Sequence, residues 1–367
     1  MQRSRLVAVA VVTAAAMLGL GAGVTTALVR ASVSPSSTAA PPPTSPKTSA
    51  TAPSTTPAAG EDNLYYVDGT IHDGSIDVAY QPRFQTNVAS LARTTSGWVL
   101  DERFGQDGSR LVLLGADGSR TAIRVTGAHW YDVSPDGAAI AVPDRRDPGV
   151  VDFVDVADGK VLSKLTSGYT RVVNAVFTGG DDQLVLLVAD AQNHETLLRS
   201  DTRLDRLEPL HRVPGQGATL VGVDEAGRHL LMEYLAGSRQ CVAVLDLERN
   251  AAPLWRSCDY RPLGHAGMSP DGGSVAVAAS SDAIGTVTAL SVLDAATGDK
   301  TSSVRIDSGF RLLDATWTDA EHLVVQGTDD NFATATLYLC TLGVGCDSVP
   351  GAGPDDPAKD VAPGSTY

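Results

Sequence analysis

Four cysteines are the residues of this chain best able to form covalent bonds: Cys241, Cys258, Cys340 and Cys346. Four cysteines allow three pairings. The segment between Cys241 and Cys258 has the apolar pattern of a hairpin, and Cys340 and Cys346 flank a short glycine-containing loop. We therefore predict two structural disulfides, 241–258 and 340–346, the first contributing about 3 kcal/mol in the chain-entropy model. The alternative, a metal or redox site, usually has a Cys-x-x-Cys pair or a nearby histidine, and the sequence has neither.

Two acidic clusters could offer hard oxygen ligands to Ca²⁺: Asp181–Asp182 and Asp329–Asn331. Neither cluster has the ligand spacing of a known calcium loop, and Asp and Asn are favoured in turns for backbone reasons. The seven histidines have no metal-ligand spacing either. We therefore expect turn residues here, with no metal and no cofactor. The histidines are His72, His129, His194, His211, His229, His265 and His322.

Motifs of nucleophilic, phosphate or dinucleotide chemistry are absent from the sequence. Gly267–Asp271 lacks the second glycine of a Gly-x-Ser-x-Gly elbow, and there is no phosphate loop, dinucleotide fingerprint or His-Glu-x-x-His. The sequence therefore predicts no catalytic residue and favours a protein that is not an enzyme. Aromatic residues make up only 5% of the chain, and the four tryptophans lie in or beside predicted strands. We expect all four to pack in the core rather than to form ligand platforms: Trp98, Trp130, Trp255 and Trp317.

The elements that position these residues belong to a repeat. Val133–Gly137 precedes an apolar run, Ala138–Val142, and Met268–Gly272 precedes a second such run, Gly273–Val277. Weaker copies lie near Thr178, Asp224 and Thr318, and the successive steps are 44, 46, 45 and 49 residues. A degraded copy precedes Trp98. Such a fixed period indicates a repeat architecture.

The two strong copies contain a turn signal, Ser-Pro-Asp-Gly, between apolar runs: Ser134, Pro135, Asp136, Gly137 and Ser269, Pro270, Asp271, Gly272. Proline presets φ at the second position of a tight turn, aspartate bonds nearby backbone groups, and glycine tolerates left-handed φ. A second hairpin follows each copy, which makes four strands in about 45 residues, the period of a β-propeller blade. No sustained helical period occurs outside the N-terminal segment, so we predict an all-β propeller over residues 62–350.

The blade count follows from the length. Residues 62–350 divide into about 48 residues per blade for six blades and about 41 for seven, and typical blades favour seven. The segment 64–78 reads as the second hairpin of a repeat that lacks its first half. It either completes the last blade with strands from both chain ends or forms a small seventh blade. We expect residues 351–367 to be a disordered tail.

The Ser-Pro-Asp-Gly copies and their flanking strands resemble the WD-like propeller repeats of the TolB type, which also occur in prolyl oligopeptidases. This resemblance covers roughly residues 62–350 and implies a β-propeller. No hydrolase domain follows the repeats, so it does not imply peptidase activity, and the WD and Gly-His signatures of eukaryotic repeats are absent. The whole chain resembles membrane-anchored propeller proteins of high-GC Gram-positive bacteria.

The N-terminus has the pattern of a membrane segment. After a basic tip, Met1–Arg5, the stretch Leu6–Val29 has no charged residue in 24 positions, and as a helix it would be about 36 Å long. We predict a single-pass transmembrane anchor with residues 1–5 in the cytoplasm. The alternative is a cleaved signal peptide and a secreted protein, because Val29-Arg30-Ala31 resembles a cleavage site. Residues 30–61, rich in Pro, Ser, Thr and Ala, are expected to form a disordered stalk.

The net charge of the chain excludes some classes of binding partner. The net charge is −15, and beyond residue 60 the chain carries 24 basic and 43 acidic residues, a net charge of −19. This argues against nucleic acid and against binding of the folded part to anionic lipid. We expect a monomeric, extracytoplasmic propeller that binds a protein or envelope component through its loops. The alternative is a propeller hydrolase or lyase whose carboxylates or histidines converge in the central channel, possibly around a metal; fold alone does not choose between them.

Overall fold

The structure is a computed structural model, and in the part of the chain that it describes the regular elements are strands, apart from one short 3-10 helix. Those elements are β1 to β28 and the helix η1 (Leu247–Arg249). The structure describes residues 63–82, 87–104, 108–123, 130–201, 206–213, 215–264, 267–279, 287–306, 311–329, 334–353, 358 and 360–365. The predicted membrane segment 6–29 and the stalk 30–61 lie outside these residues. Within them, no helix has the length and apolar character needed to cross a bilayer.

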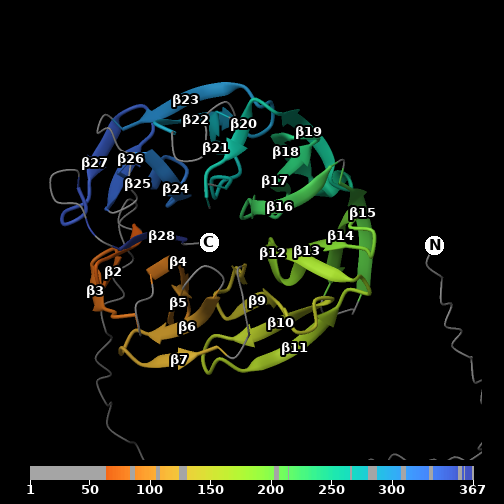
Figure 1. Ribbon diagram of the computed structural model, residues 1–367, viewed down its shortest axis with the longest axis horizontal. Helices are drawn as coiled ribbons and strands as arrows, with labels where there is room; N and C mark the ends of the chain where they lie inside the picture. Colours follow the sequence, from red (N-terminus) through yellow and green to blue (C-terminus); the bar gives the residue numbers. More distant parts are fainter. Residues whose placement is uncertain are drawn as a thin grey trace, which may run out of the picture. The chain divides into compact units, whose positions relative to one another are not determined.

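Seven four-stranded blades form a ring (Figure 1). Five of them are separate antiparallel sheets in which the chain proceeds from the inner strand outwards. Blade 2 contains β8 (Asp132–Val133), β9 (Ala139–Pro143), β10 (Val150–Asp155) and β11 (Val161–Thr166); blade 3 contains β12 (Arg171–Thr178), β13 (Gly180–Ala189), β14 (Glu195–Asp201) and β15 (Arg206–Arg212); blade 4 contains β16 (Gln216–Val223), β17 (His229–Ala236), β18 (Arg239–Asp246) and β19 (Ala252–Ser257); blade 5 contains β20 (Tyr260–Pro262), β21 (Ser274–Ala279), β22 (Ala289–Asp294) and β23 (Lys300–Arg305); blade 6 contains β24 (Arg311–Trp317), β25 (His322–Thr328), β26 (Ala335–Thr341) and β27 (Gly345–Ser348).

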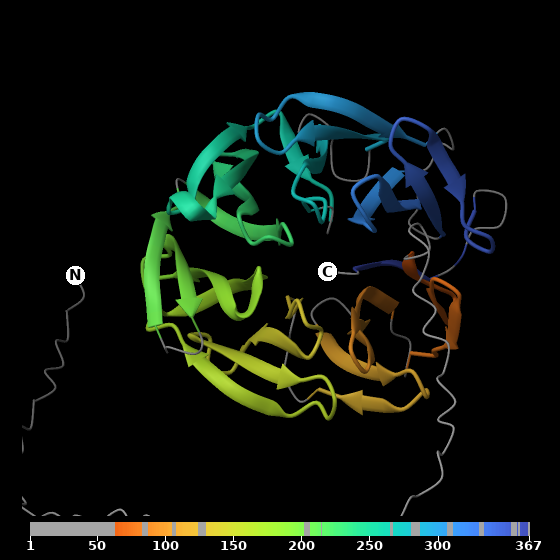
Figure 2. The same cartoon turned by 180° about the vertical axis from the view of Figure 1, so that it is seen from behind.

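The other two blades share one eight-stranded sheet, in the order β3-β2-β1-β28-β4-β5-β6-β7. Blade 7 has the C-terminal strand inside three N-terminal ones, and the parallel pairing of β28 with β4 joins it to blade 1. Figure 2 shows the same neighbourhood from behind, with β28 in deep blue beside the orange N-terminal strands. Blade 1 contains β4 (Asn87–Thr94), β5 (Gly97–Phe104), β6 (Gly108–Gly115) and β7 (Arg120–Ala122); blade 7 contains β28 (Val361–Ser365), β1 (Leu64–Val67), β2 (Thr70–Asp73) and β3 (Ile76–Ala79).

This closure confirms seven blades and shows that the half repeat 64–78 supplies the outer three strands of blade 7. The expectation of a disordered tail over 351–367 is wrong for its last strand. β28 pairs with β1 at Val67↔Val361, Tyr66↔Ala362 and Tyr65↔Pro363, and Val361 and Ala362 are buried. A strand forms despite its Pro and Gly because both of its edges find a partner, one in β1 and one in β4.

The two Ser-Pro-Asp-Gly turns have the same hydrogen bonds, as the sequence predicts. Gly137 N donates to Ser134 O at 2.7 Å, and Gly272 N donates to Ser269 O at 2.8 Å, which closes each β-turn. The buried Ser134 hydroxyl accepts from Ala139 N, and the Ser269 hydroxyl makes the equivalent bond with Ser274 N, both at 2.9 Å. Both glycines have positive φ, +68° and +72°. Each turn therefore joins the inner strand of its blade to the second strand.

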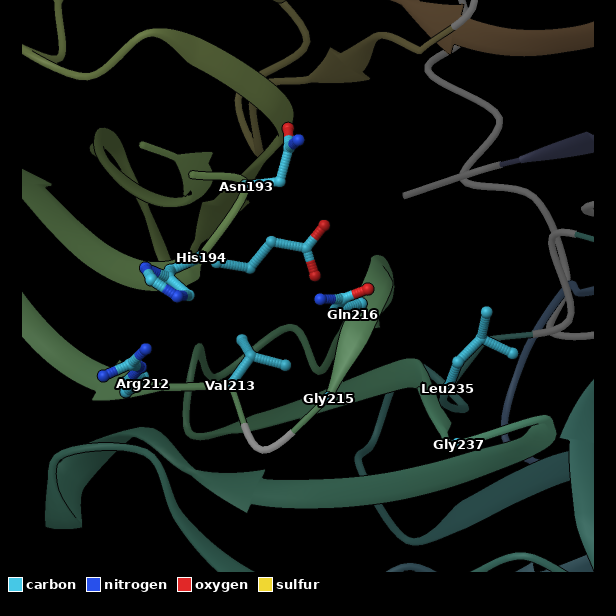
Figure 3. A pocket seen from close by; sticks show the side chains of 9 residues that line it. Asn193, His194, Arg212, Val213, Gly215, Gln216, Leu235 and Gly237 are labelled. Atoms are coloured by element: carbon cyan, nitrogen blue, oxygen red, sulfur yellow. The ribbon is translucent and has the colours of Figure 1, made fainter. Parts of the chain in front are cut away.

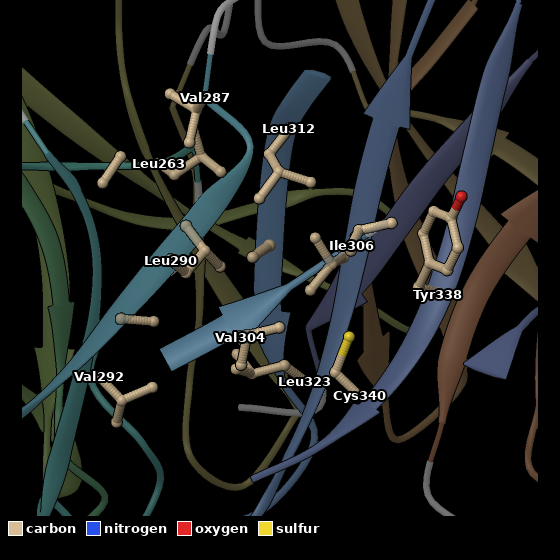
Figure 4. Packing of buried hydrophobic residues seen from close by; sticks show 14 of the residues in the cluster. Leu263, Val287, Leu290, Val292, Val304, Ile306, Leu312, Leu323, Tyr338 and Cys340 are labelled. Carbon is tan, nitrogen blue, oxygen red and sulfur yellow. The ribbon is translucent and has the colours of Figure 1, made fainter. Parts of the chain in front are cut away.

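Apolar side chains fill the spaces between neighbouring blades. Figure 4 shows one such cluster, in which Leu290 and Val304 of blade 5 pack with Leu312 and Leu323 of blade 6. The predicted disulfides Cys241–Cys258 and Cys340–Cys346 are both present.

Three of the four tryptophans pack between blades, as predicted, and each indole N–H donates to a neighbouring blade. Trp98 donates to the Asp73 carboxylate at 2.8 Å, Trp255 to Ala295 O at 2.8 Å and Trp317 to Gly267 O at 3.1 Å. The prediction for Trp130 is wrong, because its side chain is 41% exposed. Trp130 precedes the two-residue strand β8, so it lies beyond the paired part of the blade.

Candidate functional site

The ring has two faces with different connections. Strands alternate in direction, so the Ser-Pro-Asp-Gly turns and the tips between third and fourth strands lie on one face, which we call the turn face. The tips between second and third strands lie on the opposite face, together with the segments that lead from one blade to the next. We call this the connector face. Loops at the mouth of a rigid ring are where recognition usually occurs.

The connector face has a cavity of about 520 Å³ between blades 3 and 4 (Figure 3). It lies where the β13–β14 tip, the β15–β16 connection and the β17–β18 tip meet. Its lining residues are Asn193, His194, Glu195, Arg212, Val213, Gly215, Gln216, Leu235 and Gly237.

A tight turn places Glu195 at the start of β14. Asp190 Oδ1 accepts from Gln192 N at 2.8 Å and from His194 N at 2.9 Å, and Asn193 adopts a left-handed φ of +58°. Aspartate and asparagine stabilise such turns because the aspartate carboxylate bonds the backbone ahead of it and asparagine tolerates positive φ. The result is that Glu195 is the first residue to enter the sheet.

Strand alternation separates the side chains around the cavity into two groups. Glu195 and Val213 share the side of blade 3 that faces blade 4, because Leu197, two residues after Glu195, packs with Ala218 of blade 4. His194 and Arg212 start from the opposite side of the sheet. Figure 3 shows the His194 and Arg212 side chains together, away from Gln216 and Leu235. The side chains of His194 and Arg212 therefore lie at the edge of the cavity, on the side of the sheet opposite to Glu195.

Glu195 is a buried carboxylate, 4% exposed, whose Oε2 accepts from Ala218 N of blade 4 at 2.8 Å. Among the described residues, no partner is found for its other oxygen. Two walls of the cavity, the β15–β16 connection and the β17–β18 tip, approach each other closely at Gly215. A Cβ on Gly215 would lie 2.1 Å from Leu235 O. Leu235 itself is 37% exposed and offers an apolar wall at the opening.

The turn face has a smaller cavity of about 320 Å³ between blades 1 and 2. It is lined by the tips Thr94–Gly97 and Gly115–Ser119. Asp117 on this wall bonds within its own turn, accepting from Ser119 N at 2.8 Å. The polar group on this wall therefore stabilises its own turn. We regard the connector-face cavity as the candidate site.

Of the two acidic clusters considered as calcium ligands, only Asp329 has a side chain among the described residues. Asp181 and Asp182 belong to the backbone of β13, and their side chains lie outside the described part, as do Asp330 and Asn331. Asp329 accepts from the Thr334 hydroxyl at 3.0 Å, a bond within one loop. In the described part of the chain, no group of three or more His, Cys, Asp or Glu residues could hold a metal ion.

Most of the described histidines pair with an aspartate nearby in sequence, as residues of turns do. His72 lies 2.7 Å from Asp77, His194 lies 3.0 Å from Asp190 and His322 lies 2.7 Å from Asp319. His229 Nδ1 lies 3.2 Å from Asp224 Oδ2. His211 is different, because burial and the charge of Arg256 lower its pKa. His129 and His265 lie outside the described residues.

Two carboxylates on inner strands bond backbone amides. Asp132 of β8 accepts from Phe177 N of blade 3 at 2.6 Å, and Asp314 of β24 accepts from Ala315 N at 2.7 Å. Burial raises the pKa of Asp132 to about 7, against the lowering effect of its hydrogen bonds. Burial and the charge of Asp68 likewise raise the pKa of Asp360 to about 6.

These raised pKa values predict a stability that falls with rising pH. The folded state holds the protons on Asp132 and Asp360 more tightly than the unfolded chain does, so their stabilising effect is complete below about pH 4 and is lost as pH rises through about 7. Turn aspartates such as Asp190 and Asp294 act in the opposite direction but only below about pH 4, because backbone N–H groups lower their pKa. We expect the melting temperature to fall between about pH 4.5 and pH 7.5.

The matched variant is Asp132→Asn, which keeps the oxygen that accepts from Phe177 N. It should flatten this pH profile and melt above wild type at about pH 7.5, where wild type has ionised, but close to it near pH 4.5. Differential scanning fluorimetry across that range measures both profiles. Parallel profiles for the two proteins would show that Asp132 does not titrate as described.

Comparison with known proteins identifies the fold and no family. No protein-family model and no curated protein matches the chain. Among solved structures, hydrazine synthase of Kuenenia stuttgartiensis is similar with 13% identity and a TM-score of 0.52, over 70% of this chain and 78% of that one. The β-propeller domain of Myceliophteria thermophila Cps50 (Swd1) is similar with 12% identity and a TM-score of 0.51, over 79% and 90%.

A putative TolB from Agrobacterium tumefaciens matches at 14% identity with a TM-score of 0.48, over 66% of this chain and 93% of that one. At these identities the similarity concerns architecture alone. The part of the chain that the structure describes is a seven-bladed β-propeller with WD-like repeats.

Proposed function

We propose that the protein is an extracytoplasmic, membrane-tethered propeller that binds a partner protein through its connector face. The observation that carries the proposal is the cavity between blades 3 and 4, where an exposed leucine and a buried carboxylate lie at the meeting point of three connecting segments. Ligand sites in proteins are typically concave, with apolar walls and a few placed polar groups. A rigid ring holds such a site without rearrangement.

The tether is proposed from the sequence. The uncharged stretch 6–29 is long enough to span a bilayer, and residues 30–61 have the composition of a stalk. Two disulfides support an oxidising compartment, because such bonds are rare in reducing cytosol.

A channel enzyme is the second candidate, and Asp132 favours it. A carboxyl with a pKa near 7 on an inner strand suits general acid–base chemistry. A hydrolase or lyase assay with lactone and phosphoester probes, comparing wild type with Asp132→Asn, tests this candidate directly.

Site-specific photocrosslinking tests the binding proposal. A photoreactive residue at Leu235 reports on the connector face, and one at Ala116, exposed on the turn face, is the matched control. In intact cells we expect a discrete protein adduct from position 235 and none from position 116. Equal adducts from both faces, or none from position 235, would contradict the proposal.

A further inference from the structure

Glu195 lines the cavity and has hydrogen-bonding capacity that the described residues do not use. A carboxylate offers about four lone-pair sites, and the described residues supply one donor, Ala218 N. In the described residues, no lysine or arginine forms an ion pair with Glu195. The second carboxylate oxygen is therefore available to a donor that enters the cavity, from solvent or from a ligand.

The lining of the cavity around Glu195 has the chemistry that suits a long cationic side chain. Val213 and Leu235 offer apolar surface along the cavity, and the amide of Gln216 offers a further acceptor. Lysine and arginine bury an aliphatic stem against apolar walls while the charged head reaches a polar partner. A volume of about 520 Å³ exceeds the needs of one such side chain and leaves room for adjoining backbone.

The net charge of the chain also favours a cationic ligand. The chain beyond residue 60 carries a net charge of −19, which attracts a basic partner and raises its rate of association. His194 and Arg212 line the same cavity, but their side chains start from the side of the sheet opposite to Glu195. At the edge of the cavity they could instead contact carbonyl or carboxylate groups of the same partner segment.

From these observations we propose that the connector-face cavity binds the lysine or arginine side chain of a partner protein segment, with Glu195 as its counter-ion. The inference rests on the proposed function and specifies its ligand chemistry. A charge-assisted hydrogen bond in a desolvated site contributes more than a neutral one, so the charged head should dominate selectivity.

The test uses short capped peptides, Ala-Ala-X-Ala-Ala, with lysine, arginine or norleucine at X, and measures affinity by NMR titration of the full chain in detergent. We expect the lysine and arginine peptides to bind at least about tenfold more tightly than the norleucine peptide. In Glu195→Gln this selectivity should disappear, because the amide keeps the bond from Ala218 N but loses the charge. The control variant Glu225→Gln removes a carboxylate charge from the turn face and should retain the selectivity.

Two further arms keep the result interpretable. Gln216→Arg adds a cation at an exposed wall position, so it should abolish selectivity even if Glu195→Gln does not fold. Free n-butylammonium should bind much more weakly than the lysine peptide; equal affinity would mean a small-amine site and overturn the proposal. Selectivity that persists in Glu195→Gln would overturn it as well.

The photocrosslinking of Leu235 separates the two proposals. If the adduct persists while the peptides show no selectivity, the protein binds a partner on this face but not through a cation. If the peptides show selectivity and no adduct forms, the cavity binds cations and the proposed protein partner is refuted.

Discussion

Deleting residues 361–367 should leave a protein that melts at least about 15 °C below the full chain or does not fold. The deletion removes β28, which is paired on both sides, with β1 and with β4. Burial of a valine such as Val361 is worth about 1.5–3 kcal/mol, and each net hydrogen bond about 1 kcal/mol. These losses are a large part of a typical total stability of about 5–15 kcal/mol. The deletion also exposes two strand edges, which favours aggregation.

The matched control is deletion of residues 1–54, which removes none of the strands of the ring and should not change the melting temperature. A single substitution, Ala362→Asp, tests the same strand, because it places a charge at a position that is 0% exposed. Adding a synthetic peptide of residues 358–367 to the truncated chain should restore part of the lost stability. A truncated protein that melts within a few degrees of the full chain would show that the ring closes without β28.

Replacing Glu102 by Gln should destabilise the protein by about 3 kcal/mol. Glu102 lies on β5 with a side chain that is 0% exposed, and it accepts from Arg110, from Arg120 at 2.8 Å and from the Tyr80 hydroxyl. Arg120 also lies over the Tyr80 ring, 4.5 Å from its centroid. Since Tyr80 follows β3 of blade 7, this network joins blades 7 and 1. Removing the carboxylate charge takes away the buried acceptor that Arg110 and Arg120 share, which is more harmful than losing an exposed pair.

Urea unfolding followed by circular dichroism measures this effect as a shift of the midpoint. Asp158→Asn is the control, because its ion pair with Lys160 is exposed to solvent, and its unfolding midpoint should match that of wild type. The expectation fails if the midpoints of Glu102→Gln and Asp158→Asn are the same. A Tyr80→Phe variant separates the hydroxyl from the ion pairs and should have a smaller effect than Glu102→Gln.

The repeat could be predicted because its signals are local. Ser134 and Ser269 begin turns in which proline, aspartate and glycine each have a separate backbone role, and the structure reproduces the same bonds in both turns. The disulfides could be predicted for the same reason, since Cys340 and Cys346 are directly opposite each other in a hairpin. Such features depend on residues close together in the chain.

Long-range features could not be predicted from this one sequence. The segment Val361–Ser365 contains Pro and Gly, and it is a strand only because β1 and β4 lie on both sides of it. Glu195 follows an ordinary turn, and its importance depends on Ala218 in the next blade. Trp130 could not be distinguished from the packed tryptophans because the shortness of β8 decides its exposure.

The closure of blade 7 has a consequence for the order in which the protein is made. Synthesis runs from the amino terminus, so Leu64–Ala79 leaves the ribosome before Val361–Ser365 exists. Blade 7 therefore begins to emerge first and is completed last. Its strand β1 lacks its partner β28 until translation ends. A prematurely terminated chain would retain an open edge, which is the kind of surface that chaperones and proteases bind.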